Sequence, residues 1–154
     1  MKDNLKIILL ILVIASSTLV GYFFWWWLQP VKIIAVHQNG NYSDILVENF
    51  PVTDNGKINW WLQNKIKLKA QYHIPASSEQ DFYSITFWNF GAGYKEEGKY
   101  DRLCFNEMNT KKKCIEKEAV LTIDRSNNTG ILLTVYDGTY HLKNNGEIIK
   151  IKGE

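Results

Sequence analysis

The sequence predicts an α+β fold, in which an N-terminal transmembrane helix is followed by a mostly antiparallel sheet with one amphipathic helix. The segment Ile7 to Leu28 contains no charged residue. One helical pattern follows residue 53, and short β-branched and aromatic runs separated by Asn-Gly turns fill the remainder. We therefore divide the chain into a cytoplasmic tail (1–6), a transmembrane helix (7–29) and an extracytoplasmic α+β domain (31–154).

The uncharged segment is long enough to cross a bilayer. At 1.5 Å per residue its helix would span about 33 Å, close to the roughly 30 Å of a hydrocarbon core. Aromatic rings gather at its C-terminal end, and Pro30 follows them. Because Tyr and Trp concentrate at membrane–water interfaces, we expect four residues to lie in the interface of a lipid bilayer: Tyr22, Trp25, Trp26 and Trp27.

A cleaved secretory signal is the alternative for this segment, with Lys2 and Lys6 before an apolar core and a small-residue site at Ala15-Ser16-Ser17. Cleavage there would leave a free, strongly apolar terminus, so we favour an uncleaved anchor. The two lysines before the span predict that the N-terminus lies in the cytoplasm.

The first elements of the domain are a hairpin and a helix. We expect strands at 31–37 and 45–50 around the turn-forming residues 38–44. Thr53, Asp54 or Asn55 can cap the helix, which should stop before Pro75. Its predicted apolar face consists of Ile58, Trp61, Leu62, Leu68 and Tyr72, whereas Lys57 is placed on the polar side.

Strand patterns fill the chain after the helix. Two hairpin signals are the turns SNNTG and Asn144-Asn145-Gly146. We expect a break at 91–93 and a polar connection at 106–118. The whole domain should contain about seven or eight strands. The strands after the helix are expected at 82–90, 100–105, 119–125, 130–137, 139–143 and 147–152.

Two cysteines, Cys104 and Cys114, are compatible with a disulfide in an oxidising compartment. Two unrelated buried thiols are the alternative. A zinc site is poorly supported, because the nearest histidines, His73 and His141, form no ligand pattern with them.

The chemistry of the chain favours binding over catalysis. The net charge of +2 offers no basic field for nucleic acid. No catalytic motif is found, so we expect no enzyme activity and no cofactor or metal. Exposed aromatic residues favour a protein partner, and the candidate binding residues are Trp60, Gly91, Gly93 and Tyr94.

Several distinctive motifs, VHQNGNYSD, GKINWWL and YDRLCF, resemble a family of small enterobacterial membrane proteins of unknown function. The resemblance extends from the span to the C-terminus. It implies an inner-membrane protein of a Gram-negative cell with its domain in the periplasm, and it brings no catalytic residues.

The leading hypothesis is therefore a single-pass inner-membrane protein with a periplasmic protein-binding domain, either immunity-like or envelope-associated. The alternative is an envelope enzyme acting on peptidoglycan or lipid, which requires His37, His73, His141 or a carboxylate pair to converge in a cleft. A third hypothesis is a structural protein that oligomerises through small residues of its span, Ser17 and Gly21.

Overall fold

A computed structural model describes residues 2–76 and 82–151, and for residues 2, 3, 26 and 27 it describes the backbone alone. The chain divides into two compact units, Met1–Pro30 and Val31–Glu154.

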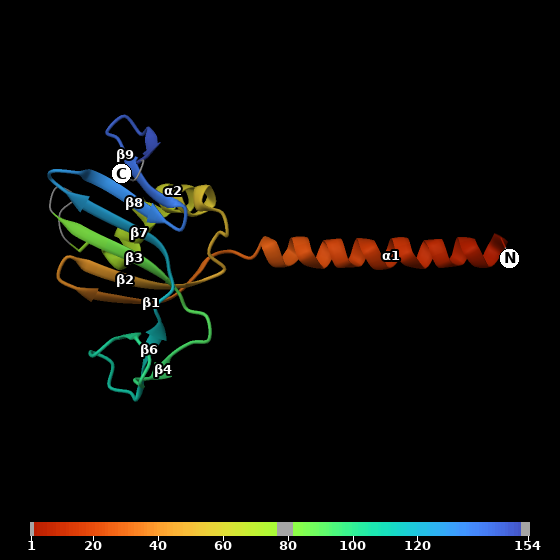
Figure 1. The fold of residues 1–154 in the computed structure, drawn as a ribbon, viewed down its shortest axis with the longest axis horizontal. Coiled ribbons are helices and arrows are strands. Elements are labelled where there is room, and N and C mark those ends of the chain that lie inside the picture. Colours follow the sequence, from red (N-terminus) through yellow and green to blue (C-terminus); the bar gives the residue numbers. More distant parts are fainter. Residues whose placement is uncertain (1, 77–81, 152–154) are drawn as a thin grey trace. The chain divides into compact units, whose positions relative to one another are not determined.

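The first unit is the helix α1 (Lys2–Trp27) (Figure 1). Its segment Asn4–Trp25 has a mean hydropathy of 2.5 and, by length and composition, could cross a bilayer. The small polar residues inside it are satisfied locally, since the hydroxyls of Ser16 and Ser17 each donate to a carbonyl three residues earlier at 2.9 Å. These bonds remove the need for water at those positions, as a helix in lipid requires.

The second unit is an α+β domain, which confirms the predicted fold class. Among the described residues, ten strands form two sheets. The larger sheet has the order β1-β2-β3-β7-β8-β9-β10 (Figure 1). Its strands are β1 (Lys32–Asn39), β2 (Tyr42–Glu48), β3 (Tyr83–Asn89), β7 (Ala119–Ser126), β8 (Gly130–Val135), β9 (Gly138–Leu142) and β10 (Ile148–Lys150).

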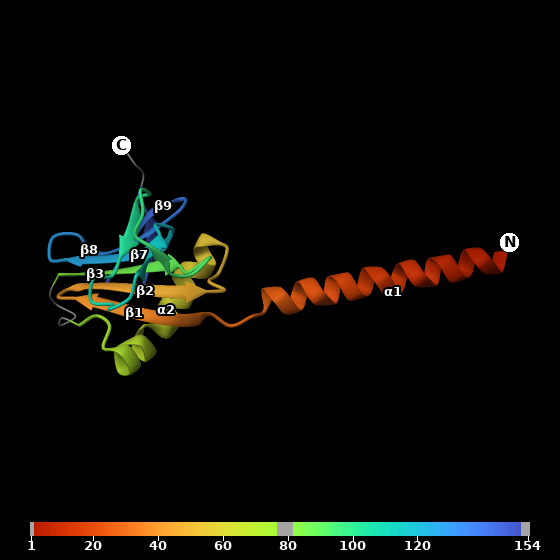
Figure 2. The same cartoon turned by 90° about the horizontal axis from the view of Figure 1, so that it is seen from below.

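One pair in this sheet is parallel: β2 and β3. Parallel neighbours need a crossover connection, usually a helix, and α2 (Asp54–Tyr72) supplies it. Thr53 caps this helix by accepting a hydrogen bond from the Gly56 N–H at 3.1 Å, one of the three caps that the sequence predicted. The helix lies on one face of the sheet (Figure 2).

The main core lies between α2 and the sheet. Ile58, Trp61 and Leu68 of the helix are buried against strand residues that include Phe87 and Ile123. Burying a side chain of this size stabilises the fold by roughly 1.5–3 kcal/mol. The predicted apolar face packs on the sheet except at its end, where Tyr72 is exposed.

The placement of Lys57 on the polar side of the helix was wrong. Its side chain is only 11% exposed, and its amine lies 3.0 Å from the Asp54 carboxylate. Asp54 also accepts the backbone N–H of Asp137 at 2.9 Å. A buried lysine is tolerated here because a carboxylate one helical turn earlier neutralises it.

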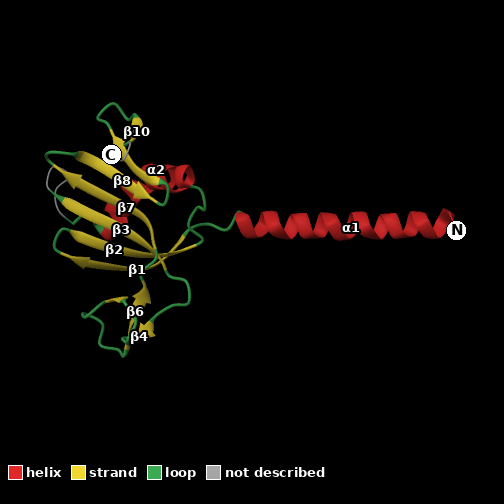
Figure 3. Cartoon of the chain, viewed as in Figure 1, coloured by secondary structure: helices red, strands yellow, loops and turns green. Residues whose placement is uncertain are grey.

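Between residues 94 and 116 the chain forms a second sheet, in the order β4-β6-β5 (Figure 3). Its strands are β4 (Lys95–Glu96), β5 (Arg102–Cys104) and β6 (Lys112–Glu116). The prediction that 106–118 is only a polar connection was wrong, since β6 is the central strand. Its polar lysines flank Cys114 and Ile115, which are fully buried.

Cys104 and Cys114 face each other directly across β5 and β6. Their sulfurs lie 2.10 Å apart, at disulfide distance. Beneath them, Phe105 and Ile115 form a second hydrophobic cluster with Leu46 of the large sheet. Because Leu46 lies between Ile45 and Val47 of the main core and strand side chains alternate, this cluster covers the sheet face opposite α2.

The first hairpin is tighter than predicted. Residues 38–44 were expected to form the turn, but β1 runs to Asn39 and β2 starts at Tyr42, which leaves Gly40 and Asn41 between them. Gly40 adopts a φ of 58°, which glycine reaches without strain.

Candidate functional site

A cavity of about 270 Å³ opens between the small sheet and the β1–β2 hairpin. The hairpin and the segment Leu103–Glu107 form its walls. Its lining residues are His37, Gln38, Asn39, Asp44, Leu103, Cys104, Phe105, Asn106 and Glu107. Titratable residues, an aromatic residue and residues of turns therefore line one cavity.

His37 is the centre of this site. Its Nδ1 lies 2.6 Å from Glu107 Oε1, and its Nε2 lies 2.9 Å from the Tyr94 hydroxyl. The imidazole stacks on Phe105 with the ring centroids 3.6 Å apart and the planes 9° from parallel. Its side chain is 12% exposed. Both ring nitrogens are thus engaged, and the ring is fixed in orientation.

Two glycines bring Tyr94 to this ring. After β3, Gly91 and Gly93 adopt φ values of 50° and 81°, and the Gly93 N–H donates to the Phe90 carbonyl at 2.9 Å. This turn sends the chain back over β3, so that Tyr94 meets Phe90 edge to face at 5.2 Å. Burial, followed by the charge of Glu107, raises the pKa of the Tyr94 phenol.

Asp44 lies directly opposite His37 in the β1–β2 pairing. The Trp88 indole N–H donates to Asp44 Oδ1 at 2.7 Å. Burial raises the pKa of the Asp44 carboxyl above 3.8, and the nearby Glu107 charge adds to the rise, while Trp88 and His37 oppose it. Asp44 is therefore a carboxylate whose ionised form is disfavoured by burial, with Trp88 as its hydrogen-bond donor.

Glu107 has the opposite environment. It sits in the turn after Phe105, with its side chain 60% exposed. Its own backbone N–H chiefly lowers its pKa below 4.5, and the contact with His37 lowers it further. The cavity therefore contains one half-buried and one solvated carboxylate together with an imidazole, which suits a hydrogen-bond donor or a cation.

The candidate binding residues fall in two places. Gly91, Gly93 and Tyr94 belong to the turn beside His37. Trp60 is half-buried on α2, where its ring packs on Phe50 and Phe87 at centroid distances of 5.1 and 5.7 Å. The structure therefore does not bring Trp60 together with Tyr94, because the sheet separates them.

The predicted interface residues lie at the C-terminal end of α1. Tyr22 and Trp25 are exposed, with their rings 6.4 Å apart. The side chains of Trp26 and Trp27 lie outside the described part of the chain.

The histidines do not converge. His37 on β1 and His141 on β9 are five strands apart, which corresponds to about 24 Å at the usual strand spacing. His73 ends α2, on the sheet face opposite His37. Instead, a carboxylate pair, Asp44 and Glu107, converges around His37.

Sequence reasoning missed Asp44 and Glu107. Asp44 was assigned to a turn and Glu107 to a polar connection, and Glu107 lies 70 positions from His37. The β1–β2 hairpin was predicted, but its tighter turn places Asp44 in β2 opposite His37. The return of the small sheet, which brings Glu107 to His37, is not encoded by any local pattern.

Comparison with known proteins identifies one family. A search of curated proteins and of solved structures finds no match. The model of the family described as "Enterobacterial putative membrane protein (DUF943)" matches residues 2–152, nearly the whole chain. With its apolar N-terminal helix and the domain that follows, the chain belongs to this enterobacterial membrane-protein family.

Proposed function

We propose that this protein is a single-pass inner-membrane protein whose periplasmic domain binds another protein. The contact surface is the His37 surface, defined as His37, Asp44, Tyr94, Phe105 and Glu107. The observation that carries the proposal is the cavity of about 270 Å³ at this surface. It is built by an appended sheet with its own hydrophobic cluster and disulfide-distance cysteines.

The character of this surface favours a protein partner. Tyr94, a residue type enriched in interaction hot spots, is bonded to His37 at the edge of a preformed depression. The ring of His37 is held by Phe105, Tyr94 and Glu107, so binding would cost little ordering of side chains. Asp44 offers a half-buried acceptor to a basic or hydroxyl side chain of the partner.

Three features support the periplasmic location. The span is preceded by Lys2 and Lys6. Paired cysteines are typical of oxidising compartments. The family is enterobacterial and described as membrane proteins. An immunity-like or other envelope-associated role fits this location and a protein partner equally.

One observation favours an envelope enzyme acting on peptidoglycan or lipid as a second candidate. Asp44 and Glu107 have pKa values shifted in opposite directions and line the same cavity, as acid–base pairs do. Against it, both nitrogens of His37 are already bonded within the domain. Catalysis by the imidazole would require one of these bonds to break first.

Position-specific photocrosslinking in intact cells tests the binding proposal. A benzoylphenylalanine at Asn39, which lines the cavity and is exposed, should give a defined crosslinked species. The same probe at Gln63, exposed on α2, is the matched control and should not give it. The crosslink should disappear with His37→Ala. Equal crosslinking at both positions, or none at Asn39, would contradict the proposal.

Topology is tested separately by fusing alkaline phosphatase after Glu154. Active fusions are expected, because the enzyme needs an oxidising compartment for its disulfides. An inactive but stable fusion would place the domain in the cytoplasm.

A further inference from the structure

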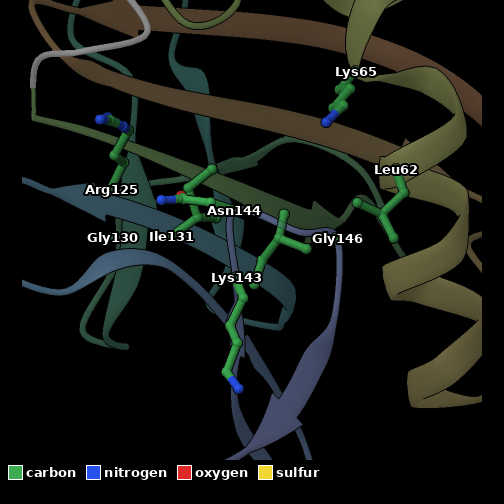
Figure 4. Close-up of a pocket in the computed structure, with 9 residues that line it drawn as sticks. Leu62, Lys65, Arg125, Gly130, Ile131, Lys143, Asn144 and Gly146 are labelled. Carbon is green, nitrogen blue, oxygen red and sulfur yellow. The ribbon is translucent and has the colours of Figure 1, made fainter.

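A second cavity, of about 390 Å³, lies on the opposite side of the large sheet from the His37 surface. It opens between the middle of α2 and the ends of β7, β8 and β9 (Figure 4). Its lining residues are Leu62, Lys65, Arg125, Gly130, Ile131, Leu142, Lys143, Asn144 and Gly146.

The lining of this cavity is one-sided in charge. Three of the nine residues, Lys65, Arg125 and Lys143, are cationic, and none is acidic. The net charge of the whole chain is only +2. Three lysine and arginine side chains around one depression are therefore a local concentration of positive charge. A concave site of one sign raises the local concentration of ions of the other sign.

The cavity also has an apolar part to its lining. Leu62, Ile131 and Leu142 are partly buried and pack on the main core. They come from α2, β8 and β9 and form the apolar part of the cavity lining. The cavity therefore combines a cationic rim with a small hydrophobic surface.

The three cations differ in how far they are engaged. Lys143 lies 3.1 Å from Glu147, and Figure 4 shows its amine pointing away from Lys65 and Arg125. Arg125 takes part in an interaction within the domain. Lys65 is exposed and places its amine 5.6 Å from the centre of the Trp61 ring. Lys65 is therefore the cation best placed to contact a ligand, since the charge of Lys143 is offset by Glu147.

We propose that this cavity binds a phosphate ester that carries a short apolar group. The phosphate would contact Lys65 at the rim, and the apolar group would cover Leu62, Ile131 and Leu142. This chemistry is shared by free organic phosphates and by the head groups of anionic phospholipids, and the test distinguishes them. The site is independent of the His37 surface and of any protein partner bound there.

Calorimetric titration of the full-length protein with butyl phosphate tests the proposal. The protein is held in nanodiscs of phosphatidylcholine, a lipid that carries no net charge. Saturable one-to-one binding with a dissociation constant in the range of about 1 mM or tighter is expected. Binding should weaken as salt is added. No saturable heat, or equal binding of butyltrimethylammonium, would overturn the proposal.

Matched lysine variants locate the site. Lys65→Gln should weaken binding by about tenfold, which corresponds to about 1.4 kcal/mol. Lys67→Gln removes an exposed charge from the same helix outside the cavity, and it should bind like the unaltered protein. Equal affinities for the two variants would overturn the assignment. Circular dichroism verifies that both remain folded.

A third arm separates the two sources. Replacing part of the phosphatidylcholine with phosphatidylglycerol should reduce the apparent affinity for butyl phosphate if a lipid head group occupies the cavity. An unchanged affinity assigns the site to a free phosphate ester.

Discussion

The paired cysteines should stabilise the small sheet locally rather than the domain as a whole. Cys104 and Cys114 are ten positions apart and bridge β5 to β6. For a loop of this length the chain-entropy model gives a contribution of about 2.8 kcal/mol at 25 °C. The small sheet rests on few buried side chains, chiefly Phe105 and Ile115, so it has little else to oppose local opening.

The perturbation is the double variant Cys104→Ala/Cys114→Ala, and the assay is amide hydrogen exchange of the full-length protein followed by mass spectrometry. A loss of about 2.8 kcal/mol makes the opening of residues 102–116 about a hundredfold more favourable, so their exchange should accelerate by about that factor. The exchange rates of the β3 and β7 amides should change by less than about threefold, because these strands carry the fully buried Phe87 and Ile123.

Reduction of the unaltered protein with dithiothreitol supplies the matched control, since it breaks the bridge without removing the sulfurs. It should reproduce the exchange pattern of the variant. Acceleration of less than about fivefold in residues 102–116, or an equal acceleration across the whole domain, would refute the local role assigned to the bridge.

Three further predictions concern the main core. Asp54→Ala should lower the free energy of unfolding by about 3 kcal/mol in urea titrations, because it leaves the buried Lys57 unpaired. Adding Lys57→Met to this variant should recover much of the lost stability. No recovery would contradict the pairing of Asp54 with Lys57. Burial opposes ionisation of Asp54, but Lys57 and the Asp137 N–H outweigh it and lower its pKa below 3.8, so the stability it contributes is present above that pH and is lost as the pH falls through the folded-state value. The difference between the unaltered protein and Asp54→Asn should therefore shrink below pH 3.8, and a constant difference in urea titrations down to about pH 2 would contradict this. Phe87→Ala should cost about 3–5 kcal/mol, since Phe87 is fully buried; a urea midpoint unchanged from that of the unaltered protein would show that the side chain does not support the core.

Local patterns were sufficient for several elements. The helix from Asp54 to Tyr72 was predicted from a capping residue and from apolar residues at helical spacing, both of which act within a few positions. The turns near Asn128 and Asn145 were predicted for the same reason, because Asn and Gly favour the backbone angles of tight turns. Each of these signals is contained in a stretch of fewer than about 20 residues.

The candidate site depended on long-range pairing. β6 carries two lysines beside Cys114 and Ile115, so its sequence resembles a polar connection until β4 and β5 pair on either side of it. Lys57 was placed on the polar face because its burial depends on a partner, Asp54, that neutralises it. Periodicity reports the average polarity of a face and does not report such a partner.

The sequence by itself determined the apolar N-terminal helix, the fold class and the helix α2, because composition, length and near-neighbour chemistry control all of them. The choice of Thr53 among three candidate caps and the pairing of Cys104 with Cys114 came from the structure. Only the tertiary structure decided the parallel pairing of β2 with β3 and the second sheet. It also decided the meeting of His37 with Asp44, Tyr94 and Glu107. The physical reason is that these contacts join residues up to 70 positions apart, and their energy is gained only when distant strands pair and exclude water from the space between them.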